Sequence, residues 1–142
     1  MTPAKQRLVR RAVLARLKAD EALTALVAAT SINPVGVPAM PFIKLSAPVE
    51  RPFQAAGVDG AIVSWDIHAF AGPRDEAGAV VETAEDHAGS IGAAVQTALF
   101  NDWLALEGGG KARLSLSDIR LLPDGGTEAY HWFAQINARV LA

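Results

Sequence analysis

The chain of 142 residues contains no cysteine, and only 20% of its residues are charged. Without cysteine, disulfides and thiolate metal sites are excluded, and a reducing compartment is the default expectation. The two signs of charge nearly cancel, and the net charge of −2 gives no overall argument for nucleic-acid binding. The hydrophobic content of 51% is typical of a globular chain and not of a disordered one.

No stretch of the sequence has the pattern of a signal peptide or a membrane helix. The basic start, MTPAKQRLVRR, has no apolar region of the signal-peptide type behind it. The longest uncharged run, from Ala22 to Ile43, is long enough to span a membrane. It contains prolines at 34, 38 and 41, however, and prolines at that density break a helix. We therefore expect a soluble protein in which this run is the end of a helix followed by a loop.

Two regions carry the hydrophobic spacing of helices. Residues 4–18 repeat apolar positions three and four apart, which predicts a helix with one apolar face. A short second helix is expected at 21–29, with Asp20 as its N-cap. The longest helical pattern runs from Ala77 to about Trp103, after the turn-like sequence GPRDEA.

Alternating apolar and polar residues predict the strands, and in the last of them His131 is among the residues that face outward. The predicted strands are a proline-bounded edge segment within 41–48, the stretch 61–71, the stretch 111–122 with an irregularity near Asp118, and the C-terminal stretch 129–142. The turn sequence PDGGT joins the last two as an antiparallel hairpin.

These elements predict one α+β domain over residues 1–142. Its sheet is expected to be mainly antiparallel, with about four strands, a long helix packed on one face and an N-terminal helix. The proline-rich residues 31–57 are expected to form a long loop around the short edge strand, and loops of this length usually serve a function or are mobile.

The stretch SWDIHAF places Ser64, Asp66 and His68 at alternate positions of one predicted strand. These residue types form hydrolytic triads, but in a strand they stand in a row, about 6.6 to 6.8 Å from one to the next. Asp66 would lie between the other two, whereas a triad needs the histidine in the middle. We therefore interpret the row as the polar face of a strand and expect no catalytic residue here.

The three histidines, His68, His87 and His131, do not have the spacing of a metal-binding pair. Asp66 and His68 offer two ligands, which are too few without help from elsewhere in the fold. His87 lies in the long predicted helix beside two acidic residues, and we interpret that stretch as a solvated helix face. No metal or cofactor site is expected.

Five strings, in this order, resemble the tail-terminator (tail-completion) family of long-tailed phages, prophages and gene-transfer agents. They are RLVRRAVLARLKADEALTALV at 7–27, MPFIKLSAP at 40–48, SWDIHAFA at 64–71, EDHAGSIGAAVQTAL at 85–99 and RLSLSDIRLLPDGGTEAYHWFAQINARV at 113–140. The resemblance covers nearly the whole chain and rests on ordered patterns, without an invariant catalytic motif. The link between the third and fourth strings is longer than the family leads us to expect, so a loop near 72–83 is the alternative to a helix start.

The resemblance implies a structural protein with no enzymatic activity and no cofactor. It implies a small α+β subunit that assembles as a six-fold ring at the head-proximal end of the tail tube. The ring would end tube polymerisation and provide a surface for head joining. The implied partners are other copies of the chain, the tail tube protein and the head connector or stopper protein, with no membrane and no sequence-specific nucleic acid. The implied location is the virion tail, after assembly in the bacterial cytoplasm.

A closed ring needs two unlike surfaces that meet between neighbouring copies. The predicted interface residues are Arg7, Arg11, Arg16 and Lys18 on the basic N-terminal helix and Asp75, Glu76, Glu82 and Glu85 on an acidic surface. The segment predicted to dock onto the tube or connector lies in the proline-rich loop, at Pro48, Val49, Glu50, Arg51 and Phe53. Such a loop can become ordered when it binds.

Three other functions stay open at this point. The nearest is a head–tail connector or stopper protein of the same particle, since sequence patterns separate these neighbours poorly. A small hydrolase using Ser64, Asp66 or His68 is a second, and a ligand-binding α+β domain is a third. The sequence also does not distinguish a phage from a gene-transfer agent.

Overall fold

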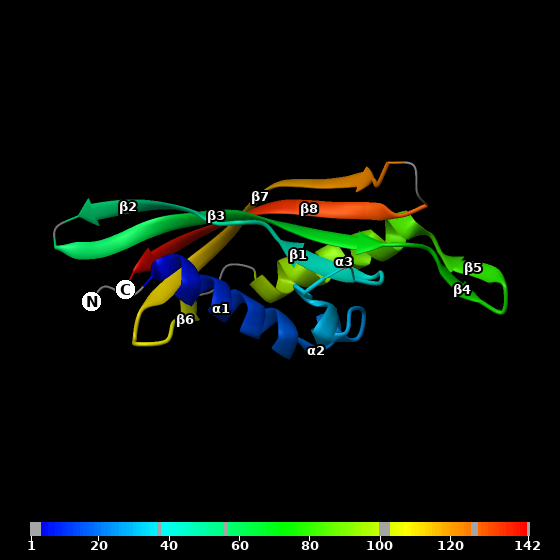
Figure 1. The fold of residues 1–142 in the computed structure, drawn as a ribbon, viewed down its shortest axis with the longest axis horizontal. Helices are drawn as coiled ribbons and strands as arrows, with labels where there is room; N and C mark the ends of the chain where they lie inside the picture. Colours follow the sequence, from blue (N-terminus) through cyan, green and yellow to red (C-terminus); the bar gives the residue numbers. More distant parts are fainter. Residues whose placement is uncertain (1–3, 37, 56, 100–102, 126–127, 142) are drawn as a thin grey trace.

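The computed structural model describes residues 4–36, 38–55, 57–99, 103–125 and 128–141 (Figure 1). Its helices are α1 (Lys5–Ala19), α2 (Glu21–Thr24) and α3 (Ala84–Leu99), with a 3-10 turn, η1, at Ala29–Ser31. Its strands are β1 (Phe42–Leu45), β2 (Val49–Ala55), β3 (Val58–Ala71), β4 (Arg74–Glu76), β5 (Ala79–Glu82), β6 (Trp103–Ala105), β7 (Lys111–Pro123) and β8 (Tyr130–Leu141). None of the described helices has the length and apolarity needed to cross a membrane.

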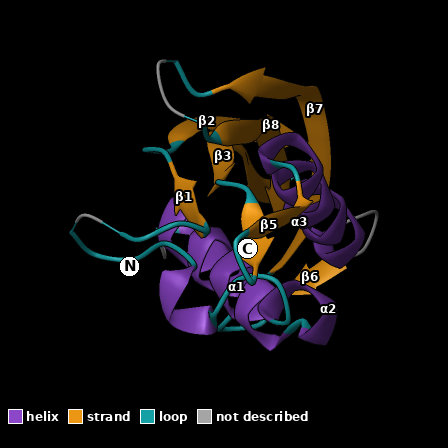
Figure 2. Ribbon diagram, turned by 90° about the vertical axis from the view of Figure 1, so that its right-hand side faces the viewer, coloured by secondary structure: helices purple, strands orange, loops and turns teal. Residues whose placement is uncertain are grey.

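The main sheet is antiparallel and has six strands. Its order is β1-β3-β8-β7-β6, and β2 pairs with β3 on the same edge as β1 but further back along the strand. The sheet curls around the helices, as Figure 2 shows. The α+β class and the antiparallel sheet are confirmed, whereas the predicted count of about four strands is too low.

All three helices lie against one face of this sheet (Figure 1). Alternate residues of β3 and β8 point toward that face, and Val63, Ile67 and Ile136 are fully buried there. Helix α3 packs across β3, β7 and β8. At Gly92 the helix approaches so closely that a β-carbon would overlap the indole ring of Trp132.

Polar contacts hold α1 against the β1 end of the sheet and the β2–β3 hairpin. The Arg10 guanidinium donates to the carbonyl oxygens of Leu45 and Ser46, at the end of β1. Lys5 is buried and forms an ion pair of 3.1 Å with Asp59 at the start of β3. Asp20 caps α2 by accepting from the Leu23 backbone N–H, as predicted, although α2 ends at Thr24 and not near residue 29.

The stretch 74–82 forms a β-hairpin, so our prediction that the long helix begins near Ala77 is wrong. Strands β4 and β5 form a separate two-stranded sheet, and α3 begins at Ala84. The turn residues Ala77 and Gly78 have φ angles of 50° and 82°. A two-residue hairpin turn requires positive φ at both central positions. A right-handed helix does not continue through residues with positive φ, so no helix runs through this turn. Figure 1 shows this hairpin projecting from one end of the molecule.

The proline-rich region contains two strands, so the long loop predicted at 31–57 is wrong for much of its length. The short edge strand is confirmed as β1, but β2 was missed because it contains Pro52. A proline lacks the N–H for a sheet ladder, yet β2 pairs on only one side, with β3, and tolerates it. The irregularity predicted near Asp118 is confirmed by a register shift in β7 and a φ of 52°.

Candidate interaction surfaces

The helices leave the opposite face of the sheet uncovered, and the polar alternation of the strands points there. Its centre is a row of hydrogen-bonded polar side chains. The Ser64 hydroxyl lies 2.9 Å from the amide oxygen of Asn137, whose amide nitrogen donates to Ser117 on β7. Ser64 is thus engaged with Asn137 and not with His68, and the polar residues of the SWDIHAF stretch lie on the outer face of β3.

One end of this face carries a cluster of aromatic and histidine rings. Phe42 stacks on Phe70 at 4.8 Å between ring centroids, and Phe70 stacks on His131 at 4.3 Å. His68 lies beside His131, with the Nδ1 atom of His68 2.6 Å from the Nε2 atom of His131. The His68 ring also lies 5.2 Å from the Phe133 ring, measured between ring centroids. The cluster joins three neighbouring strands, β1, β3 and β8.

The His68–His131 contact requires that one of the two facing nitrogens carries a proton and the other does not. Burial lowers the pKa of His68, although Asp66 opposes this effect. Burial also lowers the pKa of His131, the neighbouring His68 lowers it further, and Asp124 opposes both. The lowered pKa values favour the neutral form of both rings, and protonation of both would place two cations in contact.

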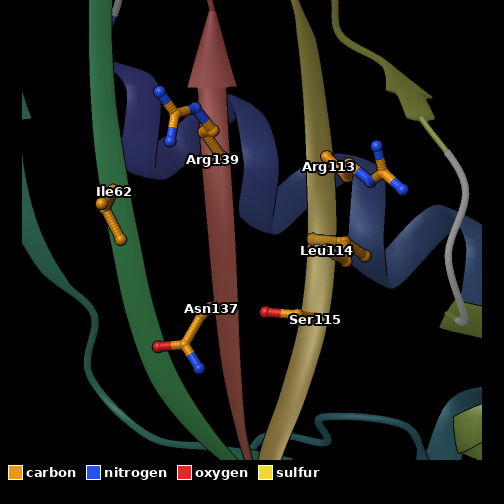
Figure 3. Close-up of a pocket in the computed structure, with 6 residues that line it drawn as sticks. All are labelled: Ile62, Arg113, Leu114, Ser115, Asn137 and Arg139. Atoms are coloured by element: carbon orange, nitrogen blue, oxygen red, sulfur yellow. The ribbon is translucent and has the colours of Figure 1, made fainter.

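The other end of the uncovered face carries a cationic groove. Its volume is about 330 Å³, and its lining includes Ile62 of β3, Arg139 and Asn137 of β8, and Arg113 and Ser115 of β7. Figure 3 shows Arg139 extending toward β3 and Arg113 extending away from β8, so the two guanidinium groups point in opposite directions, and Asn137 and Ser115 lie further along the same strands.

Arg113 and Arg139 are direct partners across β7 and β8. The pairing of their backbones does not bring the two guanidinium groups together, because the side chains extend in opposite directions. The Arg139 guanidinium lies 4.9 Å from the ring centroid of Phe53, and that of Arg113 lies 6.0 Å from the ring of Trp103. Lys111 also lies over Trp103, at 4.7 Å. The aromatic rings therefore orient the cations that flank the groove.

The acidic residues predicted for an interface do not form one continuous surface. Asp75 and Glu76 are exposed on the projecting β4–β5 hairpin, whereas Glu85 is exposed in the first turn of α3. Glu82 forms an ion pair of 2.8 Å with Arg74 across the hairpin. The hairpin thus carries two exposed carboxylates near its turn and a neutralised pair at its base.

The basic residues predicted for an interface all lie on α1. Arg7, Arg11 and Lys18 are exposed, and Arg16 is half-buried. Arg11 forms an exposed ion pair of 3.0 Å with Glu107 of the same chain. Glu107 of the same subunit therefore already pairs with one member of this basic row, Arg11.

Of the residues predicted for docking, Pro48 directly precedes β2 and the others belong to the β2–β3 hairpin, at the end of the molecule opposite to β4–β5 (Figure 1). Val49 and Arg51 are exposed, and Pro48 is half-buried. Glu50 accepts a hydrogen bond from the backbone N–H of Gln6 on α1, and Phe53 lies under Arg139. These residues are held by pairing with β3, so a loop that becomes ordered only on binding is the wrong description.

His87 is buried, so its interpretation as part of a solvated helix face is wrong. Its Nδ1 lies 2.8 Å from the Gly72 carbonyl oxygen, where the chain leaves β3 for the projecting hairpin. Of the residues that the structure describes, no group of three or more histidine, aspartate or glutamate side chains is arranged to hold a metal ion.

Sequence reasoning missed both the histidine pair and the cationic groove. Each joins residues that are far apart in the chain, since His68 and His131 lie on β3 and β8 while Arg113 and Arg139 lie on β7 and β8. The outward positions of the β3 and β8 histidines were predicted from alternation. Their contact depends on the register between the strands, which alternation along one strand does not determine.

Comparisons with known proteins agree on one family and one fold. Residues 11–141 match the family model described as "Tail completion protein gp17". The fold is similar to a chain in a structure titled "Virion of native gene transfer agent (GTA) particle", with a TM-score of 0.77 and 22% sequence identity over 99% of this chain and 100% of that chain. No curated protein matches.

Proposed function

Because this chain belongs to the family of tail completion proteins, we propose that it forms a ring that caps the head-proximal end of a phage-like tail tube. The ring ends tube polymerisation and provides the surface to which the head connector or stopper protein binds. The observation that carries the proposal is the family match, which extends over residues 11–141. The function is structural, without an enzymatic step.

The form of the subunit supports a ring. A head-to-tail ring requires two different surfaces on each copy, so that one surface of a subunit binds the other surface of its neighbour. The molecule is elongated, with the β4–β5 hairpin at one end and the β2–β3 hairpin at the other (Figure 1). Asp75 and Glu76 are exposed on the first of these hairpins, and the basic counterpart that the sequence predicts is the α1 row of Arg7, Arg11, Arg16 and Lys18.

The β2–β3 hairpin is the proposed contact with the tube protein or the head connector. Val49 is 57% exposed, and Arg51 is exposed beside it, so the hairpin offers an apolar and a charged group to a partner. Pairing with β3 holds the hairpin in place before a partner arrives, which reduces the ordering cost of binding. Replacing Val49 and Arg51 together by alanine should then impair joining without unfolding the subunit.

Deletion of the gene from the strain that makes the particles tests the proposal. The expected result in negative-stain electron micrographs is tubes of excess length without heads, because no ring stops polymerisation. Expression of the intact chain from a plasmid should restore tails of normal length that carry heads.

Two other results would change the conclusion. Tails of normal length that fail to join heads would favour a connector or stopper role in the same particle, which is the second candidate for members of this family. Normal infectious or transducing particles from the deletion strain would exclude both roles and return attention to a ligand-binding or hydrolytic domain.

A further inference from the structure

We propose that the β4–β5 hairpin of one copy of the chain adds its β5 strand to the open edge of β7 in a second copy, so that the two sheets become continuous. The proposal deepens the proposed ring by assigning both sides of one contact between subunits, and it rests on that function. The segments that form the contact are Arg120–Pro123 of β7 and Ala79–Glu82 of β5.

The first support is the open edge of β7. Within the described residues, β7 pairs with β8 along one side, whereas on its other side β6 covers only Lys111–Arg113. The second half of β7 therefore lies at the margin of the sheet, as Figure 1 shows. Backbone N–H and C=O groups that are unpaired at such a margin are a template for another strand.

The second support is the apolar character of this edge. Leu121 is 37% exposed on the face that the helices cover, where it lies near Gly89 of α3. Leu122 is 43% exposed on the opposite face, where its cross-strand partner is His131. A strand that pairs here would cover both leucines, because successive side chains of a strand point to opposite faces. Exposed apolar residues on an open edge are what proteins usually avoid, so their presence indicates a contact.

The third support is a match in length. A register shift between Ser117 and Arg120 interrupts β7, and the strand ends at Pro123, which has no N–H to donate. The regular part of the edge is therefore Arg120–Pro123, which is as long as the four residues of β5. A longer strand would meet the irregularity, so this edge favours a short partner.

The fourth support is the hairpin, which has the complementary features. Among the strands of the described residues, β5 pairs only with β4, and a two-stranded hairpin gains stability from a third strand. Val80 and Val81 are 61% and 48% exposed, and in the joined sheet they would lie beside the leucines of β7. Asp75 and Glu76 are exposed on β4 and give the hairpin a charge opposite to that of Arg120.

The connections of the hairpin decide between contact within one chain and contact between two copies. The chain passes from Ala71 of β3 to Arg74 of β4 in three steps, which span about 10 Å, and only Thr83 separates β5 from α3. The open edge of β7 lies beyond β8, so a strand added there would be three strand spacings, about 14 Å, from β3. The hairpin is therefore held at its own β3 and α3, and the strand that pairs with β7 comes from a neighbour. Two unlike surfaces that meet in this way are the kind of contact from which a ring is built.

Cross-linking in assembled particles gives the direct test, and the absence of cysteine makes it selective. The variant carries Val80→Cys on the hairpin and Leu122→Cys on the β7 edge, and purified particles are treated with a short bismaleimide. We expect a ladder of multimers of this chain on a denaturing gel. The control variant pairs Val80→Cys with Ser115→Cys, an exposed site on the same strand about 23 Å from Leu122, and it should give no ladder.

Two variants of the hairpin test whether the contact is an added strand. In the deletion strain, Val80→Lys with Val81→Lys should fail to restore tail length, because lysine on an edge strand opposes pairing with another strand. Val80→Thr with Val81→Thr is the matched control and should restore it, because threonine keeps the branched shape and the strand preference of valine. Both positions are exposed, so both purified variants should melt at the temperature of the native chain, which excludes loss of folding.

A charge exchange tests the role of Arg120. Arg120→Glu should fail to restore tail length, and so should Asp75→Lys with Glu76→Lys. The chain that carries all three changes should restore it, because the charges are exchanged but still complementary. Glu21→Lys, exposed on α2, is the control and should behave as the native chain.

Several outcomes would overturn the inference. No ladder in particles whose tails have normal length, or an equal ladder from the Ser115 control, would reject the contact and leave the proposed ring intact. Normal capping by the double lysine variant would reject strand addition. Reversal of Arg7 and Lys18 that prevents capping, with Arg120→Glu tolerated, would assign the acidic hairpin to α1. Normal tails in the deletion strain would reject the ring itself, which is a separate result.

Discussion

The histidine pair on the uncovered face of the sheet makes the stability of the protein sensitive to pH. His68 and His131 share one hydrogen bond of 2.6 Å, and the pKa of each is lowered, first by burial. In the unfolded chain both histidines regain the ordinary pKa of 6.5. Below that pH the unfolded state binds more protons than the folded state, so acid favours unfolding.

We therefore expect the free energy of unfolding to decrease as pH falls below 6.5, until the pH reaches the lowered pKa values of the folded state. Replacing His131 by phenylalanine keeps a ring in the cluster and removes one of the two titrating groups. Urea unfolding at pH 7.5 and at pH 5.5 should show a smaller difference for His131→Phe than for the native chain. Phe42→Leu is the control, since Phe42 stacks on Phe70 at the edge of the cluster, and its replacement removes a ring but no titrating group, so it should lower stability equally at both pH values.

Gly92 determines how closely α3 approaches the sheet. A β-carbon at this position would overlap the indole ring of Trp132, which is itself buried. Gly92→Ala should therefore lower the free energy of unfolding by about 1–3 kcal/mol through overpacking. Gly89 lies on the same helix, where a β-carbon would be 3.7 Å from Leu121, an ordinary contact. Gly89→Ala should instead raise stability by about 0.5–1 kcal/mol through helix propensity, and a melt that shows equal effects would contradict this account.

At the scale of elements, the β4–β5 hairpin is the part of the fold least supported by the rest. Within the described residues, β4 and β5 contact mainly each other. The hairpin is joined to the body by its two ends, and His87 of α3 contacts the Gly72 carbonyl oxygen just before β4. Its turn places Ala77 at a φ of 50°, a region in which a residue with a β-carbon is strained. The base of the hairpin therefore sets its position, and the strained turn lowers its stability.

Changing the turn should alter the hairpin without altering the body. Ala77→Asn creates the Asn-Gly pair that this turn type favours and should stabilise the hairpin by roughly 1 kcal/mol. Hydrogen exchange should then slow about fivefold at the amides of 75–82 and stay unchanged in β3 and β8. Ala79→Asn, placed in a strand and not in the turn, is the comparison. If both changes protected the hairpin equally, turn strain would not be the cause.

The elements that alternation and helical spacing predicted well are those whose two faces have different surroundings. Strand β8 is the clearest case, because Trp132, Ala134, Ile136, Ala138 and Val140 are all buried while the residues between them are not. The hairpin at 74–82 was missed because its residues are nearly all exposed, which leaves no buried face to produce a pattern. Strand β6 was missed because it has only three residues.

At the scale of the whole molecule, the surfaces were harder to predict than the fold. The sequence identified the acidic residues of the hairpin and the class of the sheet, and it placed the histidines of β3 and β8 on outward faces. It did not identify Arg113 and Arg139, because their significance lies in the β7–β8 register and in the aromatic rings beside them. Nor did it show that the uncovered sheet face divides into an aromatic end and a cationic end.

The length of β3 has a consequence for the size of the assembly. This strand runs for 14 residues, about 46 Å, and separates the β2–β3 hairpin and groove from the β4–β5 hairpin. In the ring that we propose, copies that meet at these two ends of the molecule would be spaced by the length of this strand. Removing two residues from β3 and from its partner strands would shorten each step by about 7 Å and narrow the bore. The diameter of the cap, and its match to the tube below, would then be encoded in the length of a single strand.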